Sequence, residues 1–355
     1  MALIRTDYGL IYNTDGSLCA TLLPEGGVAV TEGTENLVTN PKRSSVGNND
    51  HQKVEDTGET YLGCKIFKTT KITSSTPGNQ LCAISIADGE TYTASIYQKC
   101  LFNAGEDFAG RLTFYNTATS QVLAQVQTRE VNKWERLKIT YTNNTGATLN
   151  DVRVFYYPAK TQGSITLTAA PQVEKKPFDT PFVEGTRPAG ILSYPELAKQ
   201  FNQREFTFAA WWRPYEKIPS GQDERLFHTD TGSGAPGNFI GMRRLAGTQN
   251  LRLVFPDAAG TGAQGFTYEP PSYEANLWHF VAVVLDVPNM KVRVHLNGEF
   301  QEFTLAETPA MLDLQRFFLG CNGTIGQLNG ELKNVQIINE ALPVEVINNF
   351  LNPAN

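Results

Sequence analysis

The sequence predicts an all-β protein made of two β-sandwich domains in series, with a short N-terminal arm. Short strand-like stretches separated by turn residues follow one another along the chain, and no βαβ alternation or long helical pattern interrupts them. The length of 355 residues exceeds what one hydrophobic core usually serves. Four prolines, Pro171, Pro177, Pro181 and Pro188, gather near the middle of the chain and indicate the boundary between the domains.

The composition is typical of a globular protein and argues against several partners. The net charge of −6 is spread without long runs of one sign, so no nucleic acid or anionic membrane is expected to be held by bulk electrostatics. The longest apolar run, Phe280–Leu285, is too short to cross a bilayer, so we expect no membrane insertion. Residues 1–23 lack the apolar stretch of a secretory signal, which favours folding in a cytosol. Five cysteines without Cys-x-x-Cys spacing predict neither a disulfide framework nor a zinc site.

The first half of the chain is expected to contain the arm, residues 1–35, and the first sandwich, residues 36–174. In Glu135–Thr142 apolar and polar residues alternate, as a half-buried strand requires. Further strands are expected at Thr91–Lys99, Arg111–Tyr115, Val122–Thr128, Val152–Tyr157 and Ser164–Thr168.

The second half is expected to contain a proline-rich extended connector, residues 175–188, and the second sandwich, residues 189–355. Asn297-Gly298 between two strand patterns predicts a hairpin, because a type I′ turn needs positive φ at both central residues. Pro343 is expected to open a short C-terminal helix. Further strands are expected at Glu205–Arg213, Leu251–Phe255, Phe280–Leu285, Lys291–Leu296, Glu299–Thr304 and Glu331–Ile338, and long loops at Gln222–Asn238 and Phe255–Pro271.

Three ordered motifs in the second sandwich resemble the concanavalin A-like and laminin-G-like lectin family. They are Phe206-Thr-Phe-Ala-Ala-Trp-Trp-Arg-Pro214, Leu277-Trp-His-Phe-Val-Ala-Val-Val-Leu-Asp286 with the following Asn297-Gly298 hairpin, and Leu328-Asn-Gly-Glu-Leu-Lys-Asn-Val-Gln-Ile-Ile-Asn-Glu-Ala-Leu342. The resemblance implies a jelly-roll β-sandwich.

The first sandwich resembles the galactose-binding-like jelly rolls used as carbohydrate-binding modules. The resemblance lies in Asn36-Leu-Val-Thr-Asn-Pro41, Thr91–Tyr97, Trp134–Tyr141 and Ile165–Glu174. Where that family often has an acidic residue of a calcium site just after the Asn-Pro pair, this chain has Lys42, Arg43 and Ser44. We therefore expect no cofactor, and a calcium ion stays an open alternative without a clear motif.

The connector Pro177-Phe-Asp-Thr-Pro-Phe-Val-Glu-Gly-Thr-Arg-Pro188 joins these two kinds of module, and the chain starts Met1-Ala-Leu-Ile-Arg-Thr-Asp-Tyr-Gly9. Both features resemble virion proteins of tailed bacteriophages. This resemblance is an analogy of domain architecture. It implies that the protein is part of a virion and implies no chemical activity.

Motifs of catalysis are missing from the sequence. Glycosidases on the concanavalin A-like scaffold need paired carboxylates, written Glu-x-Asp-x-x-Glu, and this spacing does not occur here. Neither a Gly-x-Ser-x-Gly nucleophile nor a His-Glu-x-x-His zinc motif occurs. His279 is expected in the core, His295 on a solvated face, and His51 and His228 in loops without ligand spacing. The sequence therefore predicts no catalytic residues and no enzyme.

Sugar binding uses flat aromatic rings together with polar side chains that reach the hydroxyl groups. Trp134, Trp212 and Trp278 fit buried strand positions, so they are expected in the cores. Alternation along the strands turns other aromatic side chains outward, and the two long loops carry acidic and amide groups for a hydroxyl or a cation. The candidate ligand-binding residues are Trp211, Tyr97, Tyr156, Asp223, Asp230, Asn238 and Asp257.

The leading interpretation is a non-enzymatic surface protein of a phage virion, assembled in the host cytoplasm. It would dock on other virion proteins through residues 1–35 and present its lectin-like domains to glycans on host or environmental surfaces. Many weak contacts from a homo-oligomer or from many copies would add up to adhesion. Two alternatives stay open: a purely structural capsid or tail decoration protein without sugar binding, and an accessory or catalytic module of a glycan-degrading enzyme.

Overall fold

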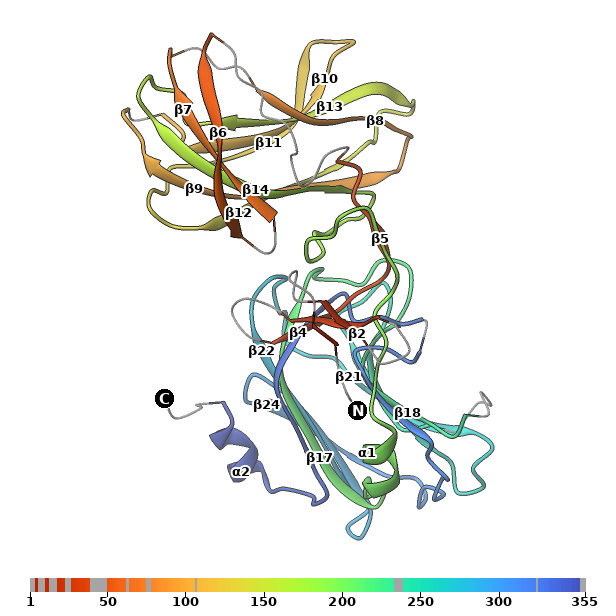
Figure 1. Cartoon of the computed structure of the whole chain (residues 1–355). Helices are drawn as coiled ribbons and strands as arrows, with labels where there is room; N and C mark the ends of the chain where they lie inside the picture. The colour runs from red at the N-terminus through yellow and green to blue at the C-terminus, as the bar shows by residue number, and fades with distance from the viewer. Residues whose placement is uncertain are drawn as a thin grey trace. The chain divides into compact units, whose positions relative to one another are not determined.

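The computed structural model confirms the all-β class, because strands make up 52% of it and helices 4%. The chain divides into a first domain, Thr34–Arg187, and a second domain built from Met1–Gly33 together with Pro188–Asn355 (Figure 1). The structure describes residues 4–5, 10–12, 18–22, 27–38, 50–61, 64–74, 78–105, 107–232, 239–323 and 325–351.

Two antiparallel sheets form the first domain. The five-stranded sheet has the order β12-β9-β14-β7-β6, and the four-stranded sheet has the order β11-β10-β13-β8. Alternate residues of both sheets, such as Ile96 and Val154, meet in a shared core. The strands are β6 (Gln52–Tyr61), β7 (Cys64–Lys71), β8 (Asn79–Ile86), β9 (Thr91–Phe102), β10 (Gly110–Asn116), β11 (Gln121–Thr128), β12 (Glu135–Thr142), β13 (Leu149–Pro158) and β14 (Ile165–Glu174), with β5 (Thr34–Glu35) paired to β15 (Thr186–Arg187).

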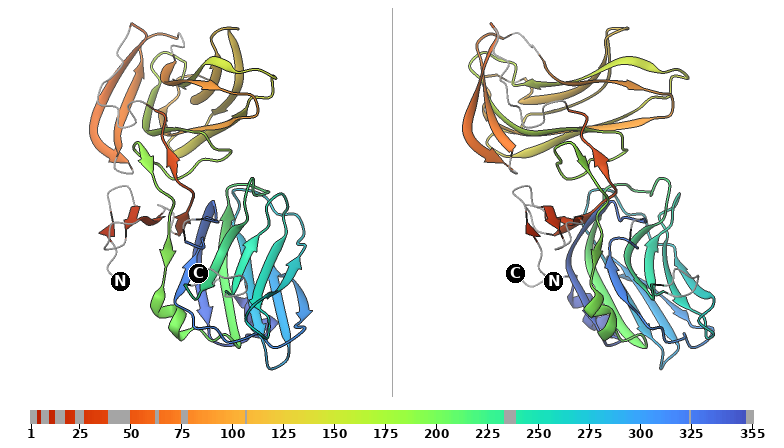
Figure 2. Two further views of the ribbon diagram at one scale, coloured as in Figure 1. Left: turned by 90° about the vertical axis from the view of Figure 1, so that its right-hand side faces the viewer. Right: turned by 45° about the vertical axis from the view of Figure 1, so that its right-hand side comes forward.

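The second domain is a sandwich of a nine-stranded and a six-stranded sheet, seen as two layers in Figure 2. The nine-stranded sheet contains, in order, β1 (Ile4–Arg5), β2 (Leu10–Tyr12), β3 (Leu18–Leu22), β4 (Val28–Val30), β26 (Gly330–Ile338), β17 (Glu205–Pro214), β22 (His279–Asp286), β23 (Lys291–Leu296) and β24 (Glu299–Thr304). The six-stranded sheet contains β16 (Leu192–Ser193), β25 (Arg316–Leu319), β18 (Glu224–Asp230), β19 (Gly241–Arg244), β20 (Leu251–Pro256) and β21 (Ala263–Tyr268).

The core of the second domain follows the predicted alternation of β17. Phe206, Phe208 and Trp212 are fully buried between the sheets, which confirms the expected burial of Trp212. The hairpin between β23 and β24 is also confirmed, because Asn297 has φ 53° and Gly298 has φ 94°.

Residues 1–35, expected as a separate arm, are divided between the domains in the structure. β4 pairs with β26, and Val30 lies in the core of the second domain against Gly320. Thr34 and Glu35 instead pair with Arg187 and Thr186 in the first domain. The apolar Val28-Ala-Val30 segment explains this placement, because a short apolar strand pairs between β3 and β26 and buries Val30 in the core of this domain.

Two stretches expected as long loops contain strands. β18 lies inside 222–238, because Leu226 and Phe227 enter the core and carry the segment into the sheet. β21 lies inside 255–271 at the edge of the six-stranded sheet, where a glycine-containing strand is tolerated.

Two short helices complete the second domain, α1 (Pro195–Gln200) and α2 (Val344–Asn349). α2 directly follows Pro343, as predicted, and buries Ile347 against Ala282 and Val284 of β22. These β22 residues face away from the main core, so α2 covers part of the outer face of the nine-stranded sheet. Among the helices described, none has the length and apolarity needed to span a membrane.

Candidate functional site

Three arginines lie side by side on the outer face of the six-stranded sheet. Arg225 of β18 is directly opposite Arg243 of β19, and Arg243 is directly opposite Arg252 of β20. Their chain neighbours Met242 and Leu251 point into the core, so the three arginines point away from it. We refer to Arg225, Arg243 and Arg252 as the arginine row.

One carboxylate accompanies the arginine row. Asp223 Oδ2 lies 2.9 Å from Arg243 Nη1 and 3.8 Å from Arg225 Nη1. Asp223 Oδ1 accepts a hydrogen bond from the backbone N–H of Ala246 at 2.9 Å. Arg252 makes neither an ion pair nor a hydrogen bond through its side chain with any described residue. Three guanidinium charges therefore stand against one carboxylate.

The guanidinium groups of the row are partly buried and leave donors unused. The side chains of Arg225 and Arg243 are 13% and 22% exposed, so each lies along the sheet and reaches solvent only in part. Burial, and then the charge of Arg243, lowers the pKa of Arg225 to about 10. Within the described chain, the Nε atoms of all three arginines lack a hydrogen-bond partner. Unused donors of this kind are uncommon in folded proteins and call for a physical explanation.

Two glycines leave room for these side chains on the sheet surface. A Cβ at Gly265 of β21 would lie 2.6 Å from Arg252 Nη2, so a side chain there would displace the guanidinium. A Cβ at Gly241 would lie 3.2 Å from Nδ1 of His228. The cationic row and the neighbouring imidazole therefore occupy space that only glycine leaves open.

An aromatic patch adjoins the row. His228 of β18 lies opposite Phe318 of β25, and its ring is 4.7 Å from the ring of Phe239. Arg316 lies 5.3 Å over the Phe318 ring and binds Asp230 through two hydrogen bonds of 3.0 and 2.8 Å. The outer face thus combines cationic donors with flat apolar rings.

His228 is 8% exposed and does not lie in a loop as expected, because β18 extends through it. Burial, and next the charge of Arg225, lowers the pKa of His228 to about 4. Its Nδ1 has no hydrogen-bond partner in the described chain. His295, expected on a solvated face, is fully buried because it lies opposite Ala282 under α2, and burial lowers its pKa to about 4 as well.

These two histidines predict an acid-sensitive fold. In the folded protein both imidazoles are neutral, with a pKa below the value of about 6.5 in the unfolded chain. Their contribution to the free energy of unfolding is therefore fully present above pH 6.5 and is lost as the pH falls toward 4. We expect His295→Leu to reduce the fall in the free energy of unfolding between pH 7 and 4.5 by up to about 3 kcal/mol. Urea unfolding at both pH values measures this difference. Equal falls in wild type and variant would contradict it.

One family model matches the second domain. Residues 189–348 match the family model Laminin_G_3, described as the concanavalin A-like lectin/glucanases superfamily. The second domain is a concanavalin A-like domain. This confirms the resemblance predicted for residues 189–355, whereas the galactose-binding-like resemblance of the first domain stays a prediction. A search of the curated proteins found no match.

Several solved structures are similar at low identity. The carbohydrate-binding module CBM40 of the Ruminococcus gnavus IT-sialidase, bound to α2,3-sialyllactose, is 11% identical; the match covers 42% of this chain and 83% of that one with a TM-score of 0.37. A heptameric SAP-like pentraxin from Limulus polyphemus is 18% identical over 41% of this chain and 68% of that one, with a TM-score of 0.32. The leech intramolecular trans-sialidase is 12% identical over 46% of this chain and 26% of that one, with a TM-score of 0.40.

The predicted site residues of the concanavalin A-like domain are only partly brought together. Asp223 and Asp230 lie on the same outer face, each in an ion pair with arginine rather than open to a cation. Asp257 instead closes the turn after β20, where its Oδ1 accepts the N–H of Thr261 at 3.0 Å. Backbone N–H groups of this turn, that of Gly262 first, lower the pKa of Asp257. Asn238 lies outside the described residues.

Trp211 faces away from the main core, as alternation predicted, but it is packed on the opposite sheet. Its ring meets Phe280 edge-on at 5.8 Å in the cluster beneath α2. Lys333 lies 6.0 Å over Trp211 and 4.1 Å over Trp278. Trp278, expected in the core, is therefore only half-buried, because it precedes β22 and covers a cationic side chain.

In the first domain the structure separates the two predicted tyrosines. Tyr156 is fully buried and its hydroxyl donates to Gln98 Oε1 at 2.7 Å, so its expected outward position is wrong; alternation along β13 turns it into the core. Tyr97 lies on the outer face of the five-stranded sheet beside Tyr61 and beneath the Arg136 guanidinium. Trp134, expected in the core, instead stacks on Tyr61 at 4.4 Å and is half-buried.

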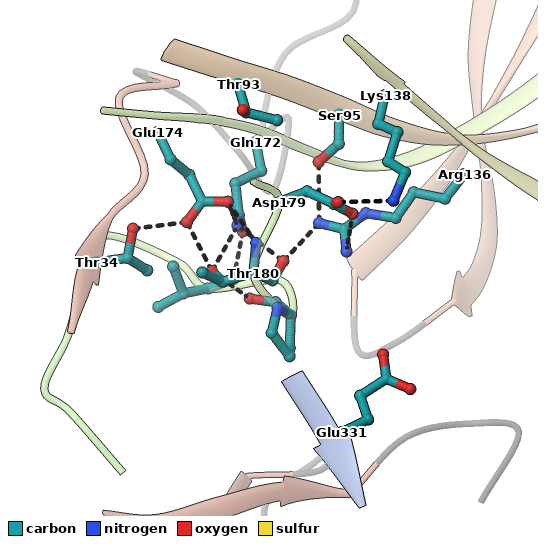
Figure 3. Close-up of polar contacts among 12 residues, drawn as sticks. Thr34, Thr93, Ser95, Arg136, Lys138, Gln172, Glu174, Asp179, Thr180 and Glu331 are labelled. Atoms are coloured by element: carbon teal, nitrogen blue, oxygen red, sulfur yellow. Dashed lines mark hydrogen bonds and ion pairs between the residues drawn. The ribbon is translucent and has the colours of Figure 1, made fainter. Parts of the chain in front are cut away.

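The proline-rich connector is folded onto the five-stranded sheet (Figure 3). Buried Glu174 accepts hydrogen bonds from Thr34 Oγ1, from Gln172 Nε2 and from both the N–H and the hydroxyl of Thr180. Asp179 forms ion pairs with Arg136 and Lys138 of β12 at 2.9 and 3.0 Å. Residues 175–187 are therefore part of the first domain rather than a free extended linker.

Sequence reasoning missed all three members of the arginine row. Each follows or precedes an apolar core residue, which is the signal of an outward position in a strand. The direct opposition of the three side chains depends on the register of three strands, and periodicity does not give that register.

Proposed function

We propose that this protein is a non-catalytic glycan-binding protein whose concanavalin A-like domain holds sugar on the outer face of its six-stranded sheet. One observation carries the proposal: the arginine row, with its unused donors, lies next to the rings of Phe239 and His228. Sugars present hydroxyl acceptors around apolar ring faces, so they need both kinds of group. The family match supports this reading, because the family includes lectins by its description.

The role of the acidic groups supports the non-catalytic part of the proposal. The two carboxylates on this face, Asp223 and Asp230, are held by arginines in ion pairs. A glycosidase needs two carboxylates free to meet the glycosidic bond. The arrangement favours binding without cleavage.

The test is binding of the purified full chain to a broad glycan array. We expect selective binding to a subset of the glycans and no new reducing ends after prolonged incubation with the bound ones. Absence of binding across the array would contradict the glycan-binding function. Release of reducing ends would favour the alternative of a glycan-degrading enzyme.

We also propose that the protein is displayed in many copies on a phage particle, where weak contacts act together in adhesion. The support is the sequence resemblance of the connector and the chain start, and docking through residues 1–35 rests on the sequence alone. Purified particles should contain the protein, and particles depleted of it should rebind it and attach better to glycan-coated surfaces. Rebinding without any gain in attachment would favour the purely structural role.

A further inference from the structure

We infer that the ligand of the arginine row is an acidic glycan, one that carries a carboxylate, sulfate or phosphate group. The inference rests on the proposed function and names the ligand class of the same site. The outer face carries an excess of positive charge, because Arg225, Arg243, Arg252 and Arg316 outnumber Asp223 and Asp230. The whole chain has a net charge of −6, so this positive excess is a local property of the face.

The strand register places the positive charges of the row opposite one another, which is electrostatically unfavourable unless an anion is bound. Like charges directly opposite each other destabilise a sheet, and here Arg243 is directly opposite an arginine on both sides. Asp223 neutralises one end, and the guanidinium of Arg252 has no partner in the described chain. A neutral sugar would fill donors and leave the repulsion in place. A bound anion would fill the donors and also remove the repulsion, because it accepts hydrogen bonds and neutralises charge.

The chemistry of arginine favours the same class of ligand. A guanidinium is a planar fork of donors that matches the oxygens of a carboxylate, sulfate or phosphate in pairs. Asn, Gln or Thr would serve neutral hydroxyls without the cost of like charges. His228 lies beside the row, and burial lowers its pKa, so its imidazole is neutral and adds no further positive charge to the face.

The size of the row favours a sugar acid over a long polyanion. Three adjacent strands span about 10 Å, which is the scale of one or two sugar rings. Both carboxylates lie on the β18 side of the row: Asp223 pairs with Arg243 and Arg225, and Asp230 pairs with Arg316 of β25. An extended nucleic acid, which carries a charge at every phosphate, would meet these carboxylates, whereas a single acidic sugar at the Arg252 end of the row would not.

The experiment compares matched acidic and neutral ligands on the full chain. Biolayer interferometry measures binding of 3′-sialyllactose against lactose for a carboxylate, and of dextran sulfate against dextran for a sulfate. Single-stranded DNA of about 20 nucleotides serves as a polyanion without acidic sugars. We expect at least one acidic ligand to bind about tenfold or more tightly than its neutral counterpart, and salt to weaken that binding.

The decisive variants are Arg252→Gln and Arg243→Gln, each expected to weaken binding of the acidic ligand about tenfold or more. Arg252→Lys keeps the charge without the fork and should fall between wild type and Arg252→Gln. Because Arg252 has no partner in the described chain, Arg252→Gln should not lower the melting temperature. Exposed Arg204→Gln removes the same charge before β17 and is the matched control, with unchanged binding.

The outcomes separate this inference from the proposed function. Equal binding of neutral and acidic ligands, unchanged in Arg252→Gln, would overturn the acidic ligand and leave glycan binding intact. DNA binding as tight as that of the acidic saccharides would overturn it in favour of an unspecific polyanion surface. Binding of no glycan in the array would overturn both.

Discussion

Replacing Arg244 by Met is expected to destabilise the concanavalin A-like domain by about 3–5 kcal/mol. Arg244 is fully buried and its Nη1 lies 2.5 Å from Glu224 Oε2. Its other nitrogens donate to the Tyr273 hydroxyl at 3.1 Å and to the backbone carbonyl of Glu216 at 2.8 Å. Burial raises the pKa of Glu224 to about 8 even with Arg244 present, so without the arginine the carboxylate would have to take up a proton or stay buried and unpaired.

Urea unfolding followed by tryptophan fluorescence measures this loss, because Trp212 packs 4.9 Å from the Arg244 guanidinium. Arg316→Met is the matched control. Its ion pair with Asp230 is 47% exposed on the arginine side, so the loss should stay below about 1 kcal/mol. Adding Glu224→Gln to Arg244→Met should restore part of the stability, since the unpaired buried charge is then gone. Equal stability of Arg244→Met and Arg316→Met would show that the buried pair does not hold this end of the sandwich.

Replacing Glu174 by Ala is expected to destabilise the first domain by about 4 kcal/mol and to loosen the connector. Glu174 is 1% exposed and accepts four hydrogen bonds, including the Thr180 N–H at 2.8 Å and the Thr34 hydroxyl at 2.6 Å. Alanine leaves these buried donors without an acceptor. Tryptic cleavage after Lys175 should then become faster, because the backbone of 175–187 is no longer held on the sheet.

Glu174→Gln is the matched control for this prediction. The amide oxygen can still accept from Thr180 N–H and Gln172, and the hydroxyls of Thr34 and Thr180 can turn to accept from its NH₂ group. We expect a loss of about 1–2 kcal/mol and nearly unchanged cleavage. If the alanine and glutamine variants were cleaved at the same rate as the wild type, the connector would be held by other contacts.

The sequence predicted the features that depend on local pattern. Alternating Phe206, Phe208 and Trp212 form the core, and Asn297-Gly298 makes the expected hairpin. Features that depend on pairing partners were not predicted. The sequence of β21 predicts a loop, because edge strands need little apolar sequence. The sequence of Val28-Ala-Val30 predicts part of an arm, because its partner β26 lies about 300 residues away.

The candidate site shows the same division. The sequence indicated Asp223 and Asp230, because acidic side chains stand out in a loop-like sequence. It did not indicate their arginine partners. These arginines make the face positively charged, whereas the aspartates alone would have suited a bound cation. Arg225, Arg243 and Arg252 lie on three consecutive strands and are brought opposite one another only by the strand register. Trp211 was correctly turned away from the main core, yet nothing in its own strand indicates that the C-terminal helix lies over it.

The central claim is that the arginine row binds the glycan. Hydrogen–deuterium exchange, measured with and without a saturating concentration of a glycan that binds on the array, tests it most directly because it locates the binding face. The account predicts slower exchange in peptides of β18, β19 and β20, which carry the arginine row, and unchanged exchange in β17 and in the first domain. Protection confined to the first domain, or to the nine-stranded sheet around Trp211 and Trp278, would contradict it.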